Sequence, residues 1–499
     1  MGVKSLVAKP LARWMRKKIM RDASMACEHQ LHWLNSLVQK AKDTQYGKDH
    51  GFDQIQNYQD FVLNNPIHEY EDLIPYIQRI KEGNANILWP GLPQYFAKTS
   101  GTTAGAKYIP ISKESMPFHI SAARNALLCY IATSGNAEFV DGKMIFLQGS
   151  PILDYLPSGI AVGRLSGIVA HHVPQYLQKN RLPKYETNCI EDWETKVDTI
   201  TRETLDQDMR LISGIPSWVQ MYFERLIDQS GKKNIKSIFP NFSLFVYGGV
   251  HYEPYRKKME SLMGGRMDTI ETFPASEGFF AYQDDIHRDD LLLNTNAGIF
   301  YEFIEVSKYH DAQPPRIPLW EVKENVQYAL ILSTNAGLWT YSIGDTVKFT
   351  SIAPYRIKVT GRIKHYTSAF GEHVIAEEVE NAMQSALKEF DFIANDFHVA
   401  PKVNVQDELP YHEWFIESAE IPTNSADIAQ FLDDKMTEQN IYYKDLIEGK
   451  VLQPLKIKWL PVGSFHQAMK AGGKLGGQNK VPRLANHRDF ADLLSQSPS

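Results

Sequence analysis

The spacing of apolar and polar residues predicts alternating helices and strands through the first 360 positions. The clearest helix covers 216–230, where apolar side chains recur every three or four residues. Pro216 suits its first turn, and Gly231 suits its C-terminal end. Apolar runs predict strands at 143–149, 242–249 and 266–273, with a short helix closed by Gly264 between the last two. This alternation favours a mixed or parallel sheet covered by helices.

The order of predicted elements changes after residue 360. The apolar pattern then predicts a helix at 376–389, strands at 397–403 and 411–418, a helix at 425–438 and a strand at 452–460. This order is typical of a small α+β domain. Because 499 residues exceed one ordinary hydrophobic core, we expect two domains. These are a large α/β domain at 1–360 and a small α+β domain at 361–499.

Composition narrows the compartment and the kinds of partner. The net charge is −6 and the pI is near 6.3, so no general affinity for nucleic acid or for anionic membranes is expected. The three cysteines form neither a disulfide framework nor a metal-binding pattern, which fits the reducing cytoplasm. No apolar run reaches the roughly 20 residues of a transmembrane helix. Nothing in the sequence predicts the oligomeric state.

The N-terminal stretch "MGVKSLVAKPLARWMRKKIMRD" is basic and weakly amphipathic. It lacks the apolar centre of a secretory signal peptide. Leu6 breaks the myristoylation pattern that Gly2 would begin. We expect a helix that lies on the main domain, with a membrane-surface or organelle-targeting helix as the alternative.

The segment "AKTSGTTAGAKYIPIS", residues 97–112, contains a loop rich in small residues. Backbone N–H groups in such a loop can point together at an anion, and small residues permit close approach. Lys107 adds a positive charge, and hydroxyls come from Thr99, Ser100, Thr102 and Thr103. A polyphosphate fits this chemistry, although the spacing from Gly101 through Gly105 to Lys107 is not that of the Walker motif. A flexible Ser/Thr/Gly turn is the alternative.

Two acidic side chains follow predicted strands further along the chain. In "ETFPASEGFF", Ser276 and Glu277 follow a strand, and open α/β sheets bind ligands at the C-terminal ends of strands. Glu277 could bind Mg²⁺, which takes oxygen ligands and keeps phosphate partners. In "TYSIGDTVKF", Asp345 follows Gly344 in a predicted turn and could accept both hydroxyls of a ribose. A solvated glutamate and a plain turn aspartate are the alternatives.

A further segment is a candidate for the wall of a substrate pocket. The stretch "YLPSGIAVGRLSGIVAHHVP" is apolar and glycine-rich and contains Arg164. This guanidinium could pair with an acid substrate, or it could form a structural ion pair. The aromatic stretch 218–223 could also line an apolar pocket, although ordinary core packing is the more common role of such a helix.

Taken in order, these motifs resemble the adenylate-forming superfamily of acyl-CoA synthetases, adenylation domains and luciferases. The match is closer to the auxin-responsive Gretchen Hagen family of acyl acid amido synthetases. The segments that favour this family are "SGTTAGAKYIP", "FVYGGVHYEPY", "ASEGFF" and "GGKLGGQNKVPR". The resemblance extends from about residue 20 to the end. Each motif is weak alone, but their common order makes the likeness specific.

The resemblance implies a role for each matching residue. Lys107 would hold the ATP phosphates together with Ser100, Gly101, Thr102 and Thr103. The backbone of Gly248, Gly249 and Val250 would face the adenine, and Phe273 would cover it, where the superfamily usually has tyrosine. Ser276 would contact the α-phosphate, Glu277 the Mg²⁺ and Asp345 the ribose. Arg362 would lie at a hinge, and Lys480 would come from the mobile small domain to meet developing charge.

The same resemblance implies a two-step reaction. A carboxylate would attack the α-phosphorus of ATP, giving an acyl-adenylate and pyrophosphate. An amino acid amine would then attack the acyl carbon and release AMP. The reacting groups are anionic, so positioning and charge neutralisation by Mg²⁺, Lys107 and Lys480 would dominate. Two alternatives stay open: a ligase that forms a coenzyme A thioester, and a non-catalytic nucleotide-binding relative.

Overall fold

The computed structural model describes residues 2–99, 107–173, 178–190, 192–249, 252–309, 311–363, 366–367, 374–402, 408–448, 452–473, 480–485 and 488–496. Contacts group the chain into two compact units, which are described separately below. The first unit comprises 1–249 and 266–359, and the second comprises 250–265 and 360–499. Within the described ranges, no helix is both long enough and apolar enough to cross a membrane.

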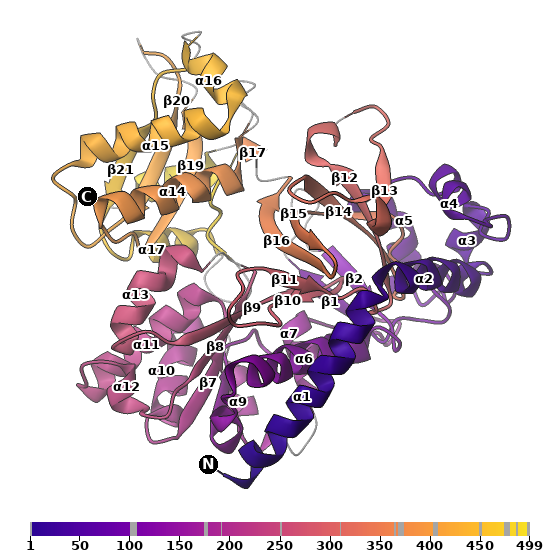
Figure 1. Ribbon diagram of the computed structural model, residues 1–499, viewed down its shortest axis with the longest axis horizontal. Coiled ribbons are helices and arrows are strands. Elements are labelled where there is room, and N and C mark those ends of the chain that lie inside the picture. The colour runs from indigo at the N-terminus through magenta and orange to yellow at the C-terminus, as the bar shows by residue number, and fades with distance from the viewer. Residues whose placement is uncertain are drawn as a thin grey trace. The chain divides into compact units, whose positions relative to one another are not determined.

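A twelve-stranded mixed sheet forms the framework of the first unit (Figure 1). Its strands, in spatial order, are β13 (Arg316–Pro318), β12 (Ile299–Glu305), β14 (Gln327–Thr334), β15 (Tyr341–Ile352), β16 (Tyr355–Arg362), β11 (Leu291–Leu293), β10 (Gly278–Tyr282), β9 (Asp268–Ala275), β8 (Leu244–Gly248), β7 (Met209–Ser213), β3 (Lys143–Phe146) and β6 (Arg181–Leu182). Neighbours from β9 to β6 pair in parallel, whereas β9 and β10 pair antiparallel. The sheet is therefore mixed, as the sequence predicted.

A four-stranded sheet carries the flanks of the glycine-rich loop. Its order is β2 (Lys107–Ile111), β1 (Tyr95–Thr99), β5 (Ala161–Gly163) and β4 (Asp154–Tyr155). Strands β1 and β2 are antiparallel, and Thr99 lies opposite Lys107. The two ends of the loop are thus held side by side by a strand pair.

Helices cover the sheets of the first unit. They are α1 (Val3–Ser24), α2 (Ala26–Ala41), α3 (Gln45–Asp49), α4 (Tyr58–Asn64), α5 (Tyr70–Lys81), α6 (Met116–Ser134), α7 (Leu165–Ala170), α9 (Tyr185–Asn188), α10 (Trp193–Thr204), α11 (Pro216–Ser230) and α12 (Ile235–Ile238). Side chains of α1 and α6 form one core cluster with Leu211 of β7, Leu244 of β8 and Ile270 of β9. One face of the parallel strands is therefore closed by α1 and α6.

The predicted helix at 216–230 is confirmed in detail. Helix α11 has Pro216 in its first turn and ends at Gly231, which adopts a left-handed φ of 63°. Its aromatic residues are buried, and the hydroxyl groups of Tyr222 and Thr204 lie 2.6 Å apart. The aromatic stretch therefore serves core packing.

The second unit is a small α+β assembly. Strands β19 (Asp396–Lys402), β20 (Tyr411–Glu417) and β21 (Lys456–Leu460) form a three-stranded sheet, and β17 (Tyr366–Thr367) pairs with β18 (Val374–Ile375). Its helices are α13 (Glu253–Met263), α14 (Ala376–Phe390), α15 (Ser425–Gln439), α16 (Ile441–Glu448), α17 (Ser464–Ala471) and α18 (Asp489–Ser495). Figure 1 shows α14 and α15 lying across the sheet. The predicted order is confirmed, although β21 begins at Lys456 and not at 452.

The segment 250–265 departs from the expected division at 360 and 361. It contains α13 and groups with the C-terminal unit. Tyr255 of α13 accepts a hydrogen bond of 2.8 Å from Nη2 of Arg483. Both side chains are buried, so this contact draws the helix to a part of the chain far away in sequence.

Candidate active site

The structure describes the two strands that flank the glycine-rich loop, β1 and β2. Ser100, Gly101, Thr102 and Thr103 lie outside the described residues, so their expected phosphate contacts stay a prediction. Strand β1 enters the loop and β2 leaves it in the opposite direction. A Walker loop instead leads from a strand into a helix. The loop therefore belongs to a strand pair, in agreement with its departure from the Walker spacing.

Lys107 lies beside the first residue of β15. Its Nζ is 3.5 Å from the hydroxyl of Tyr341 and 5.3 Å from the centre of the Tyr70 ring. The Tyr70 hydroxyl also accepts a 2.7 Å bond from the backbone N–H of Tyr108, which fixes β2 against α5. Burial raises the pKa of Tyr70, so this phenol stays neutral at physiological pH. Lys107 and the strand that carries Asp345 are thus neighbours.

Asp345 occupies a bulge within β15. Ser342 pairs with Ile331 and Thr346 with Ala329, so three residues of β15 lie opposite one residue of β14. The predicted turn is therefore wrong, because the strand continues through the motif. Gly344 has a φ of 82°, and a Cβ at this position would meet nothing within 4 Å. The Asp345 side chain itself is 8% exposed.

Ser276 and Glu277 form the two-residue connection between β9 and β10. Ala275 and Gly278 pair across the hairpin and close it. Both connecting side chains are partly exposed. The prediction that they directly follow a strand is confirmed. Because β9 runs parallel to β8, this turn lies at the same edge of the sheet as the C-terminal end of β8.

Gly248 and Gly249 end β8 at that edge. A Cβ on Gly248 would come within 2.4 Å of the carbonyl oxygen of Thr272 on the next strand. Gly249 has a φ of 74°, which a residue with a side chain rarely adopts. Close strand packing and backbone conformation therefore require these glycines, whatever lies beyond them. Their expected contact with adenine stays a prediction.

Phe273 is packed inside the first unit. Its side chain is 6% exposed, and its ring meets that of Phe280 edge to face, with centroids 5.1 Å apart. The Phe273 ring is therefore part of the hydrophobic core. Its expected role over the adenine also stays a prediction.

Arg164 precedes α7 and lies over Gly149. A Cβ on Gly149 would come within 2.7 Å of the Arg164 Cδ. Burial lowers the pKa of Arg164, and burial together with Arg164 lowers the pKa of Lys196 to about 8. No ion pair between described residues includes Arg164. The alternative of a structural ion pair thus finds no partner in the described part of the chain.

The two predicted residues of the C-terminal unit differ in their surroundings. Arg362 is the exposed last residue of β16, close to the start of the unit at residue 360. Lys480 is exposed and comes just before an anchored segment. Within that segment, Leu484 bridges Val399, and Arg483 forms an ion pair with Asp396. Lys480 therefore lies three residues before an arginine that is anchored to the sheet of this unit.

Three side chains near these positions were missed by the sequence analysis. Tyr70 and Tyr341 surround Lys107, and Arg483 anchors the segment after Lys480. Tyr341 and Arg483 belong to the quoted motifs, which was a usable signal. Tyr70 lies in an unremarkable helix and had none.

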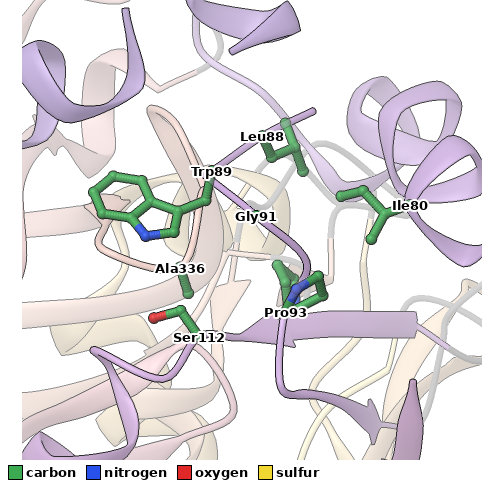
Figure 2. Close-up of a pocket in the computed structure, with 8 residues that line it drawn as sticks. Ile80, Leu88, Trp89, Gly91, Pro93, Ser112 and Ala336 are labelled. Atoms are coloured by element: carbon green, nitrogen blue, oxygen red, sulfur yellow. The ribbon is translucent and has the colours of Figure 1, made fainter. Parts of the chain in front are cut away.

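A small pocket near β2 does not qualify as the site. Figure 2 shows its lining, which is apolar except for Ser112 and comprises Ile80, Leu88, Trp89, Gly91, Pro93, Pro110, Ser112 and Ala336. The Ser112 hydroxyl donates to the carbonyl oxygen of Asn335 at 2.8 Å. No charged side chain lines this pocket, so it offers nothing to a nucleotide.

The described residues contain no cluster of three or more His, Cys, Asp or Glu side chains that could hold a metal ion. A magnesium ion that arrives with a nucleotide needs only one or two carboxylates, because phosphates and water complete its shell. Glu277 meets that requirement by residue type and position alone.

Comparison with known proteins gives the family. Three models match the chain in order: the GH3 family N-terminal domain at 15–188, the central domain at 292–362 and the C-terminal domain at 377–489. The jasmonoyl–L-amino acid synthetase JAR4 of Nicotiana attenuata is 22% identical over 63% of this chain and 65% of its own length. The indole-3-acetic acid-amido synthetase GH3.3 of Arabidopsis thaliana is 21% identical over 92% of this chain and 90% of its own.

A solved structure shares the fold. The AtGH3.15 acyl acid amido synthetase in complex with 2,4-DB superposes with a TM-score of 0.81 at 18% identity, covering 96% of this chain and 95% of the other. The chain therefore has the fold of this synthetase, and the three family models match it in order. The chain belongs to the GH3 family.

Proposed function

We propose that this protein activates a carboxylic acid with ATP and then joins the acyl group to the amine of an amino acid. The observation that carries this proposal is the ordered match to all three GH3 domain models. A relative that matches over 92% of this chain and 90% of its own length carries the name amido synthetase. The product is an amide, and the by-products are pyrophosphate and AMP.

The first step is attack of the carboxylate on the α-phosphorus of ATP. Two anions must approach, so fixed positive charge and positioning supply most of the rate enhancement. Lys107 serves the phosphates, and its place beside β15 supports a nucleotide that extends from the loop toward Asp345. Ser100, Gly101, Thr102 and Thr103 supply further donors.

The nucleoside end of ATP is assigned to the bulge and to the end of β8. Asp345 accepts the ribose hydroxyls, and its place on the strand whose first residue lies beside Lys107 supports this role. Gly248 and Gly249 border the adenine, and Phe273 contributes an aromatic surface. Ser276 contacts the α-phosphate.

Mg²⁺, when bound through Glu277, would neutralise phosphate charge as the leaving pyrophosphate develops. Lys480 meets the negative charge of the same step. Arg164 pairs with the carboxylate of the acid substrate, which is supported by its partial burial and its lack of an acidic neighbour among the described residues. Arg362 lies where the C-terminal unit begins and acts as a hinge residue between the two half-reactions.

The test is product analysis. The full chain is incubated with ATP, Mg²⁺ and a pool of aromatic and aliphatic acids, together with either all amino acids or coenzyme A. We expect pyrophosphate to appear with at least one acid, and mass spectrometry to find amides and no thioesters. Glu277→Gln is expected to abolish pyrophosphate release, whereas Glu321→Gln, an exposed carboxyl of the same unit, is expected to leave it unchanged.

Two results would redirect the proposal. Thioesters without amides would make the chain an acid–thiol ligase that shares the first half-reaction. Absence of pyrophosphate with every acid in the pool, while ATP binds, would favour a nucleotide-binding relative without catalysis.

A further inference from the structure

Helix α1 differs sharply in charge from the rest of the molecule. Between Val3 and Ser24 it carries seven basic residues and one acidic residue, a net charge of +6. The whole chain has a net charge of −6. Helix α1 thus carries a local excess of positive charge, and the proposed reaction uses none of its basic residues.

The inner face of α1 is fixed to the first unit. Ala12, Ile19 and Ala23 are buried in a cluster with side chains of α6, beside which α1 runs in Figure 1. Arg16 pairs with Asp285 at 3.2 Å. The helix is therefore held against the first unit by its inner face.

The outer face combines exposed apolar and basic side chains. Leu6, Val7, Leu11 and Trp14 are 59%, 63%, 47% and 59% exposed. At about 100° per residue, Val7, Leu11 and Trp14 lie within one narrow stripe. Exposed cations flank and continue this stripe: Lys4, Arg13, Lys17, Lys18 and Arg21.

This combination distinguishes between kinds of partner. Cations alone would serve any polyanion, including nucleic acid. A tryptophan and three aliphatic side chains among the cations instead match the boundary between lipid headgroups and acyl chains, where aromatic rings are favoured and basic residues meet anionic headgroups. Burying the large apolar side chains of the stripe in that boundary removes their exposed apolar surface from water, which is favourable.

We propose that the outer face of α1, defined as Lys4, Leu6, Val7, Leu11, Arg13, Trp14, Lys17, Lys18 and Arg21, binds the surface of an anionic lipid bilayer. The binding is peripheral: the helix stays packed on α6 while Val7, Leu11 and Trp14 enter the headgroup layer. Each basic residue near such a surface is worth about fivefold in affinity. The interaction is independent of the proposed reaction.

The experiment measures partitioning of the full chain onto vesicles by co-sedimentation. Vesicles of phosphatidylcholine alone are compared with vesicles that contain about a third phosphatidylserine, at low and at physiological salt. The basic variant combines Lys17→Glu, Lys18→Glu and Arg21→Glu, and the apolar variant combines Val7→Ser, Leu11→Ser and Trp14→Ser. The matched control combines Lys232→Glu and Lys233→Glu, two exposed lysines after α11.

We expect the wild-type chain and the control variant to co-sediment with the anionic vesicles and not with the neutral ones. The basic variant should lose at least about 100-fold in partitioning, from about fivefold per residue. The apolar variant should lose about tenfold or more. All positions changed are exposed, so the urea midpoint of unfolding should stay within experimental error in each variant.

Three results would overturn the proposal. The first is equal binding to neutral and anionic vesicles, and the second is absence of binding to either. The third is an apolar variant that binds like the wild type while single-stranded DNA displaces the protein from vesicles, because α1 would then be a general polycation.

Discussion

The position of Asp345 depends on the glycine before it. Gly344 adopts a left-handed φ of 82°, and the bulge it forms turns β15 locally without ending the strand. The Asp345 side chain is 8% exposed. A largely buried carboxylate can recognise a neutral diol by two charge-assisted hydrogen bonds.

Asp345→Ala is expected to weaken ATP binding by about 2–4 kcal/mol, or roughly 30- to 1,000-fold, because such bonds are lost as a pair. Isothermal calorimetry with ATP measures the change. Asp289→Ala, which removes an exposed carboxylate that pairs with Lys358, serves as the control and should bind ATP normally. Unchanged ATP affinity in a folded Asp345→Ala protein would remove Asp345 from the nucleotide site.

Arg164→Met is expected to raise the KM for the acid substrate by about 30- to 200-fold, since a charged hydrogen-bonded pair is worth about 2–3 kcal/mol. The KM for ATP should stay within about twofold. Pyrophosphate release at varied acid and varied ATP separates the two effects. Arg202→Met, at an exposed position of α10, is the control. An equal rise in both KM values, or a lowered unfolding midpoint alone, would assign Arg164 to structure and not to the substrate.

Linear motifs revealed most candidate residues, and the environment of those residues came only from the fold. Lys107, Ser276 and Glu277 could be selected because small residues, hydroxyls and charges follow predicted strands. The neighbours of Lys107 could not be selected from the sequence, because Tyr70 lies in a helix without any distinctive motif. A glycine in a motif is also weak evidence for a ligand. Close packing against Thr272 already requires a glycine at position 248, whether or not a ligand binds there.

At the scale of elements, the sequence predicted helix ends correctly, because a glycine next to the last turn determines them. Helices α11 and α13 both end at a glycine with positive φ, and both ends were predicted from Gly231 and Gly264. The continuation of β15 through its Gly–Asp pair was not predicted, because a bulge and a turn use the same residues. Helix α13 is joined to the C-terminal unit by the distant Arg483 and by an ion pair between Lys257 and Asp391, which no local pattern reveals.

A buried ion cluster joins β16 to the segment between β10 and β11. Arg356 donates to Asp284 at 2.7 and 3.0 Å and to Asp290 at 3.1 Å. Burial alone would raise the pKa of Asp290, but bonds from Arg288 and Thr350 lower it to about 2. Its folded pKa therefore lies below the unfolded value, so its contribution to stability is present above pH 4 and is lost as the pH falls toward 2.

Arg356→Met is expected to destabilise the first unit by about 3–5 kcal/mol, because two buried carboxylates lose their shared partner. Urea unfolding followed by tryptophan fluorescence measures the shift. Lys358→Met removes an exposed partner of Asp289 on the same strand and should change the free energy of unfolding by less than about 1 kcal/mol. Equal shifts in the two variants would show that the cluster adds no more than a surface pair.

At the scale of the whole molecule, the candidate residues divide between the two units. The first unit contains Lys107, Glu277 and Asp345, and the second contains Arg362 and Lys480. A nucleotide held by the first unit therefore has most of its expected partners without the second. We infer that residues of the second unit matter for the chemical steps more than for ATP affinity, as expected of groups that bind the transition state better than the ground state.

Lys480→Ala is expected to reduce the isotope exchange between pyrophosphate and ATP by about 100-fold or more, since loss of one charge-neutralising group costs about 3 kcal/mol of transition-state stabilisation. ATP affinity, measured by calorimetry, should change by less than about threefold. Lys444→Ala, at an exposed position of α16 in the same unit, controls for the loss of a surface charge. Arg483 anchors the segment that follows Lys480, so the variant should keep the unfolding midpoint of the wild type. Normal exchange with failed amide formation would move Lys480 to the second half-reaction, and a parallel loss of ATP affinity would place it in ground-state binding.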